Sequence, residues 1–154
     1  MMTFEEQAFK DEGWLQCVSD LLALQEVQEM KKFKHHKQTT CFTHCVHVSY
    51  ACYLYFEKHH KSGYEVARCG LLHDLFLYQR EQLPTRWLRY THVFTHGKKA
   101  MRQAMWVVDL TKRERIAIAR HMFPLTLIPP TNREGIAICI WDKLWGIKEF
   151  RGVC

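Results

Sequence analysis

Apolar residues recur three and four positions apart along most of the chain, which is the spacing of one face of an α-helix. This pattern predicts six helices, with boundaries near residues 12–32, 40–60, 63–79, 93–109, 112–122 and 132–149. The sequence contains neither period-two alternation nor the Asn-Gly and Asp-Gly pairs that mark tight hairpins. We therefore expect an all-α fold, a single compact helical bundle that spans residues 1–154 as one domain.

Polar residues indicate where some of these helices begin. Before three of the predicted helices, Ser or Thr stands three positions ahead of Glu, the spacing of a capping box. The pairs are Ser62 with Glu65, Thr111 with Glu114, and Thr131 with Glu134. The prolines fall in the proposed connections, where proline is tolerated. One connection, FPLTLIPP at 123–130, is unusually apolar, and it either folds over a cavity or packs on the core.

Two carboxylates interrupt the apolar pattern. Asp74 follows His73 inside CGLLHDLFLY (69–78), and Asp142 lies inside GIAICIWDKLWGI (135–147). An unpaired buried carboxylate costs several kcal/mol, on the order of the whole stability of a small domain. The same apolar segments offer only Arg68 and Lys143 as cationic partners.

Histidines fall in similar apolar surroundings at His44, His96 and His121. A single such histidine is more often a hydrogen-bonded core residue than a ligand. Here, however, each of the later five predicted helices contributes one or two His or Asp residues, which are ligand types for divalent metals. A metal centre would compensate both buried carboxylates at once.

The composition is ordinary for a soluble globular protein, with 47% apolar and 25% charged residues. No apolar run approaches the roughly 18–20 residues that cross a bilayer, and the N-terminus lacks the features of a secretory signal. The seven cysteines are odd in number and include no CxxC motif. We expect a cytoplasmic protein with free structural thiols and no membrane partner, and we keep a zinc site at Cys41 and Cys45 as the alternative.

The formal net charge is +6, and much of it lies in KKFKHHK (31–37), HGKK (96–99) and TKRER (111–115). A basic surface favours a phosphate-bearing partner, although it can also be a solvated face. Nucleic acid therefore stays open as a partner. Trp14, Trp87 and the apolar first helix are candidates for the interface of a homo-oligomer.

The ordered set of these residues resembles the HD-domain superfamily of metal-dependent phosphohydrolases, and specifically its members with two metal ions. The resemblance covers about residues 28–150 and rests on the stretches THCVH, GLLHDLFLY, THGKKA, IARHMFPLT and ICIWDKLWG. It implies a helical bundle in which His44, His73, Asp74 and Asp142 bind the first ion. Asp74 would bridge to the second ion, which His96 and His121 complete. The other histidines, His35, His36, His47, His59, His60 and His92, match no family position and are assigned to structural or surface roles.

The resemblance also implies cofactors and chemistry. It implies two divalent ions per chain, Fe or Mn foremost and Zn, Ni or Mg as alternatives, which would activate a water molecule for hydrolysis of a phosphomonoester or phosphodiester. A small, nucleotide-like, phosphate-bearing substrate is expected. Besides Asp74, the candidate catalytic residues are cations that would surround the substrate: Arg80, Lys98 and Lys143, with Lys99 beside them.

The sequence departs from two groups within the superfamily. Phe76 and Leu77 replace the Gly-Lys pair of the cyclic-dinucleotide hydrolases, and no Gly-Tyr-Pro motif follows. The acid that follows the His-Asp pair in the HD nucleotidases is also missing. The substrate therefore stays open. Two other functions remain as alternatives: a mixed-valence di-iron oxygenase with the same ligands, and a non-catalytic domain that binds a nucleotide or a partner.

Overall fold

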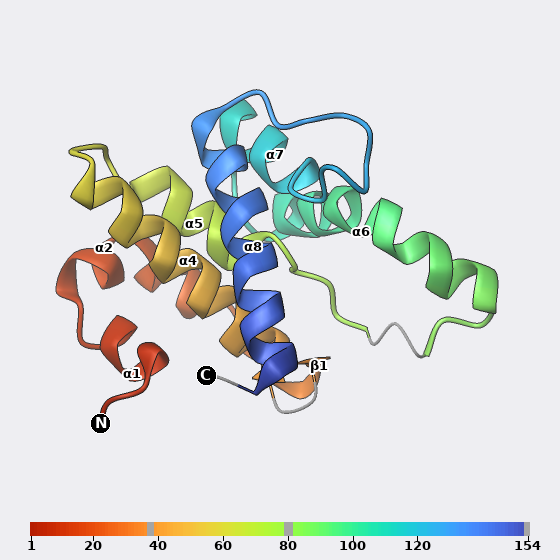
Figure 1. Cartoon of the computed structure of the whole chain (residues 1–154), viewed down its shortest axis with the longest axis horizontal. Helices are drawn as coiled ribbons and strands as arrows, with labels where there is room; N and C mark the ends of the chain where they lie inside the picture. The colour runs from red at the N-terminus through yellow and green to blue at the C-terminus, as the bar shows by residue number, and fades with distance from the viewer. Residues whose placement is uncertain (37–38, 79–81, 153–154) are drawn as a thin grey trace.

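The structure, a computed structural model, describes residues 1–36, 39–78 and 82–152. These residues form a compact all-α fold with one small hairpin (Figure 1). The α-helices are α1 (Phe4–Ala8), α2 (Glu12–Leu22), α3 (Gln25–Glu29), α4 (Cys41–Lys58), α5 (Tyr64–Leu72), α6 (Arg86–Val107), α7 (Lys112–Ala119) and α8 (Arg133–Arg151). The short elements are the 3-10 helix η1 (Met30–Lys32) and the antiparallel strands β1 (Lys34–His36) and β2 (Thr39–Thr40). The prediction of an all-α fold is confirmed.

Helix α4 forms the centre of the bundle, where it packs against both α5 and α8 (Figure 1). A chain of hydrogen bonds ties α2, α4 and α5 together: Trp14 Nε1 donates to Ser49 Oγ over 2.9 Å, and that hydroxyl donates to the carbonyl of Ala67 over 2.7 Å. Trp14 is completely buried in this arrangement, so its prediction as an interface residue is wrong. Trp87, the other candidate, is 71% exposed.

Helices α6 and α7 pack against each other, and α7 also packs against α8. Helix α6 begins at Arg86 rather than near residue 93, and its first turns extend away from the other helices in Figure 1. Side chains in these turns, Trp87 and Tyr90 among them, are exposed. The start of α6 therefore has no buried apolar stripe by which the sequence pattern could have located it.

Two predicted helices end earlier than their patterns indicated. The segment 12–32 is divided into α2, α3 and η1, with Ala23 capping the end of α2. The segment 63–79 is helical only to Leu72, after which the amide of Phe76 donates to the carbonyl of Asp74 over 2.8 Å. The His73–Asp74 pair consequently lies in the turn that follows α5, not within the helix.

Of the three predicted capping boxes, the structure forms one. At the start of α7, Thr111 and Glu114 exchange both hydrogen bonds, at 3.2 and 2.8 Å. Helix α5 instead begins after Gly63 with no side-chain cap, and α8 begins after Asn132, whose side chain accepts from the amide of Gly135. Asn132 is one residue closer to the helix than the predicted Thr131, and its side chain supplies the same cap.

The cysteines behave as predicted in the described part of the chain: Cys17, Cys41, Cys45, Cys52, Cys69 and Cys139 are free and buried. Within the same residues, no helix is both long enough and apolar enough to cross a membrane. The apolar loop 123–130 borders a groove of about 1340 Å³ beside α6 and α7, where Leu127 is 92% exposed. The loop therefore lies along a groove, and much of its apolar surface is exposed and does not pack on the core.

Candidate metal centre

The six predicted metal ligands come from different helices and converge inside the bundle. They are His44 on α4, His73 and Asp74 after α5, His96 on α6, His121 after α7, and Asp142 on α8. Among the described residues, three overlapping groups have ligand atoms within 4.8 Å of one another. The first is His44 with His73 and Asp142, the second is His73 with Asp74 and His121, and the third is His35 with His44 and Glu149. The fold thus brings together residues that are far apart in the sequence.

The first group surrounds one oxygen of Asp142. His44 Nε2 lies 3.1 Å from Asp142 Oδ1, and His73 Nε2 lies 3.6 Å from the same oxygen. His73 Nε2 is also 3.7 Å from Asp74 Oδ2. Two imidazole nitrogens and two carboxylate oxygens therefore face one small volume.

The second group lies around the other oxygen of Asp74, where His96 joins His121. The Nε2 atoms of His96 and His121 are 3.1 Å apart, and they lie 3.4 and 3.5 Å from Asp74 Oδ1. Asp74 thus directs Oδ1 toward the second group and Oδ2 toward the first. A carboxylate in this position can bridge two ions.

Backbone carbonyls orient two of the histidines. His73 Nδ1 donates to the carbonyl of Gly70 over 2.8 Å, and His121 Nδ1 donates to the carbonyl of Ile118 over 2.7 Å. Because a carbonyl only accepts, each Nδ1 carries the hydrogen, and each neutral ring presents the lone pair of Nε2 to the centre. This is how proteins fix the tautomer of a metal-binding histidine.

The nitrogen and oxygen atoms that converge here do not all find hydrogen-bonding partners in one another, and they are types of atom that bind metal ions. Among the described residues, His73 Nε2 and Asp74 Oδ1 are buried without a hydrogen-bonding partner, and burying such atoms unpaired is costly. Nitrogen and oxygen ligands about 2.0–2.2 Å from one ion lie roughly 3–3.5 Å apart. The separations around Asp74 Oδ1 match that spacing. The residues therefore fit divalent metals.

The neighbouring histidines keep the carboxylates ionised in spite of their burial. Burial alone would raise the pKa of Asp74, but the neighbouring His73 and His96 outweigh it and hold that pKa well below its usual range. Burial disfavours the charged form of His73, yet Asp74 and Asp142 raise its pKa to about 9. His96 is different, because burial, with His121 and His92 adding to it, lowers its pKa to about 4. His96 is consequently neutral at pH 7, the form that binds metal.

Two further residues reach the centre that the sequence reasoning did not assign to it. His35 on β1 lies 3.3 Å from Asp74 Oδ2 through Nε2, and its ring stacks on His44 with centroids 3.9 Å apart. Glu149 on α8 lies 2.9 Å from His44 Nδ1. Glu149 follows Asp142 by two helical turns, a spacing that places both on one face and could have revealed it. His35 lies in a basic run that resembles a solvated face and gave no such signal.

Four of the other histidines, His47, His59, His60 and His92, do not belong to the groups of possible ligand atoms among the described residues. His47 is buried against Glu149. His59 and His60 lie on the surface. His92 lies beside the site, where its Nδ1 is 3.3 Å from the hydroxyl of Tyr78.

The predicted cations lie in different places. Lys143 borders the metal centre, but its ammonium donates to the carbonyls of His121 and Cys139, each over 3.0 Å. Lys98 borders the groove beside α7 and the loop 123–130 and is not among the residues that line the cavity at the centre. Arg80 lies outside the described residues.

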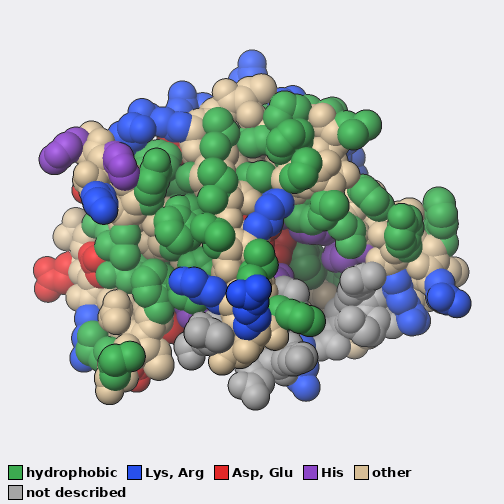
Figure 2. Space-filling model, in the orientation of Figure 1, with side chains coloured by type: hydrophobic (Ala, Val, Ile, Leu, Met, Phe, Trp, Pro, Cys, Tyr) green, Lys and Arg blue, Asp and Glu red, His purple; other side chains and the backbone are tan. Residues whose placement is uncertain are grey.

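A cavity of about 500 Å³ gives access to the centre. Asp74, His96 and Asp142 contribute to its lining, and Figure 2 shows histidine and acidic side chains deep in a hollow of this face. Its walls also include the aromatic side chains of Phe33, Phe76, Tyr78 and His92, and the exposed Lys34 stands beside it. A cavity of this size suits a small molecule with an apolar or planar part.

Comparisons of the chain with protein-family models, with curated proteins and with solved structures found no match. The protein is a helical bundle with a buried cluster of His, Asp and Glu groups that could hold metal.

Proposed function

We propose that the protein is a metal-dependent phosphohydrolase of the HD type, with two divalent ions at the centre described above. The position of Asp74 carries the proposal, because one oxygen faces His73 and the other faces His96 and His121. His44 and Asp142 would complete the first site. Two ions so placed, when bound, activate a water molecule and stabilise the charge that develops on a phosphoryl group.

The chain's own residues would hold and orient the substrate. Lys34 of β1 lines the cavity and is exposed, so its ammonium would bind phosphoryl oxygens. Lys143 would act differently from the predicted role, because two backbone carbonyls already engage its ammonium. That ammonium lies 3.9 Å from Asp142 Oδ2, where it offsets the charge of a ligand and ties α8 to the turn after α7.

The aromatic wall supports a substrate with a planar group. The ring of Phe76 lies edge-on to His92 at 5.2 Å, and Tyr78 lies 5.3 Å from Phe76. Phe76 stands where the cyclic-dinucleotide hydrolases place glycine, so this wall differs from theirs. We propose a nucleotide or another phosphate ester with an aromatic part as the substrate class.

The test is metal analysis of the purified chain followed by two assays after reconstitution with Mn²⁺ or Fe²⁺. The proposal expects two ions per chain and metal-dependent hydrolysis of p-nitrophenyl phosphate, bis-p-nitrophenyl phosphate or nucleoside phosphates. Consumption of O₂ with a mixed-valence EPR signal would instead identify the di-iron oxygenase. Less than half an ion per chain after reconstitution would exclude both enzymes and favour a non-catalytic domain.

A further inference from the structure

Glu149 is a buried carboxylate on the last turns of α8. Within the described residues, the ion pairs that it forms are all with histidines: His35, His44 and His47. A carboxylate without Lys or Arg partners is costly to bury unless several donors satisfy it. The three histidines are therefore its compensation, and Glu149 in turn determines how they are held.

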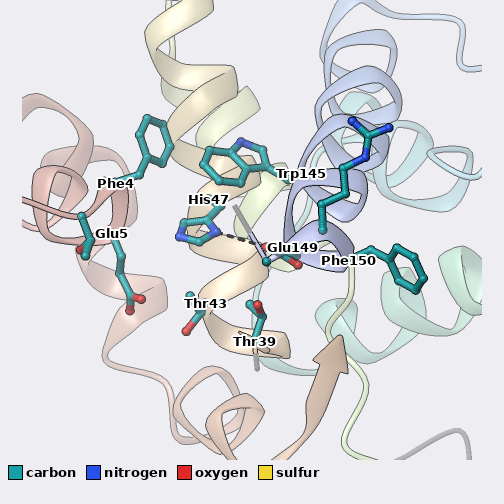
Figure 3. Close-up of a pocket in the computed structure, with 11 residues that line it drawn as sticks. Phe4, Glu5, Thr39, Thr43, His47, Trp145, Glu149 and Phe150 are labelled. Carbon is teal, nitrogen blue, oxygen red and sulfur yellow. Dashed lines mark hydrogen bonds and ion pairs between the residues drawn. The ribbon is translucent and has the colours of Figure 1, made fainter. Parts of the chain in front are cut away.

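The two carboxylate oxygens of Glu149 contact different histidines. Oε2 accepts from His44 Nδ1 over 2.9 Å and lies 3.5 Å from His35 Nδ1, whereas Oε1 accepts from His47 Nδ1 over 3.1 Å. His47 is itself stacked on Trp145, with ring centroids 4.3 Å apart, and Figure 3 shows this ring beside Trp145 with its hydrogen bond to Glu149. The packing of His47 on Trp145 therefore fixes the position of Oε1 of the Glu149 carboxylate.

The bond to His44 matters for the metal centre. Glu149 accepts from Nδ1 of His44, and in the metal-free chain Asp142 Oδ1 accepts from Nε2 over 3.1 Å. With Nδ1 held by Glu149, Nε2 is the nitrogen that a metal ion beside Asp142 and His73 would bind. A carboxylate acceptor also makes the ring a stronger electron donor to metal than a neutral acceptor does.

The second group of ligands has no comparable support. His121 Nδ1 donates to the neutral carbonyl of Ile118, and His96 Nδ1 has no hydrogen-bonding partner among the described residues. The first group also contains Asp142 in addition to its share of Asp74. The negative charges of Asp142, a ligand, and of Glu149, which accepts from a ligand, therefore both lie at the first site.

We infer that Glu149 is a positioning residue, which holds His44 as a ligand and makes the first metal site bind more tightly than the second. The ions then bind in order, the one held by His44, His73 and Asp142 before the one held by His96 and His121. This inference rests on the metal centre of the proposed function, but not on the reaction that the centre catalyses.

The experiment compares the full-length chain with its Glu149→Gln variant, both stripped of metal and titrated with Co²⁺ or Mn²⁺ against a competing chelator. For the wild type we expect two resolved dissociation constants. The variant keeps the side-chain volume but loses the negative charge, so the constant of the first site should rise about 10- to 100-fold. The second constant should change less than about threefold, because its ligands do not contact Glu149.

Glu134→Gln is the matched control. Glu134 is also buried on α8, but it accepts from Arg113 and Arg133 and stands away from the centre. Its replacement should leave both dissociation constants unchanged. In metal-free protein, NMR of the ring nitrogens should show an altered protonation of His44 in Glu149→Gln and no change in Glu134→Gln.

Unchanged metal binding in a folded Glu149→Gln variant, or equal weakening of both sites, would overturn the inference. If circular dichroism shows that this variant does not fold, Glu149→Asp is used, which keeps the charge on a shorter side chain and should weaken the first site alone. Tight, ordered metal binding without any hydrolysis would contradict the proposed reaction and leave the role of Glu149 standing. A wild-type chain that binds no metal would overturn both.

Discussion

Asp74 connects the two halves of the centre, because its oxygens face different histidines at 3.4 to 3.7 Å. Sequence reasoning identified its burial as a problem of charge and proposed a bridging role. The geometry makes that role testable. Asp74 would take part in both metal sites, whereas His121 faces only Oδ1 and would take part in one.

We therefore expect Asp74→Ala to lose both ions and His121→Ala to lose chiefly the second. Metal content after gel filtration, measured by mass spectrometry, should be near zero in the first variant and about one ion per chain in the second. His59→Ala changes an exposed histidine and serves as the control with two ions. Loss of both ions from His121→Ala would contradict a bridging Asp74.

At the scale of the helices, glycine sets the distances between ligands. A Cβ on Gly97 would stand 2.9 Å from the carbonyl oxygen of Ala119, so α6 and α7 approach closely beside His96 and His121. A Cβ on Gly70 would stand 2.6 Å from Ser49 Cα, where α5 meets α4. Neither position can accept alanine unless the backbones separate.

We expect Gly97→Ala to weaken the second metal site by at least tenfold while it leaves the first nearly unchanged. Overpacking of this kind also lowers the free energy of unfolding by about 1–3 kcal/mol. Chelator competition measures the first effect and urea unfolding the second. In Gly63→Ala, the new Cβ would meet the ring of Tyr53 rather than a backbone, so metal binding should be retained. Equal metal affinities in Gly97→Ala and the wild type would refute this account of the spacing.

Much of the helical pattern could be predicted from the sequence, because buried faces impose a spacing on apolar residues. α4, α7 and α8 followed from this signal within a few residues. The start of α6 did not, since its exposed turns bury too little to impose a pattern. The strands β1 and β2 are too short to show alternation, and their pairing, which carries His35, depends on contacts distant in sequence.

At the scale of the whole molecule, the buried ionisable groups link stability to pH. The pKa of His73 is raised to about 9 and that of His35 to about 10, the latter because hydrogen bonds to Asp74 and Glu149 outweigh burial. Groups with raised values stabilise the fold fully below pH 6.5 and lose that contribution as pH rises through 9 and 10. The pKa of His96 is lowered to about 4, so its contribution is present above pH 6.5 and is lost as pH falls toward 4.

The metal-free chain should therefore be most stable near pH 6.5. Its free energy of unfolding, from urea titrations with chelator present, should fall by a few kcal/mol, on the order of the pKa shifts, between pH 6.5 and 10. His35→Gln should reduce the alkaline part of this loss. Stability that stays constant or increases up to pH 10 would show that these histidines do not hold protons in the folded chain.

The position of α8 in the sequence has a consequence for protein synthesis. A ribosome releases His44, His73, His96 and His121 well before Asp142 and Glu149. The nascent chain consequently carries four histidines without the α8 carboxylate that helps to bind the first ion and without the one that orients His44. Because metal affinity depends on the folded arrangement, the proposed centre would select its metal only after α8 has emerged and docked.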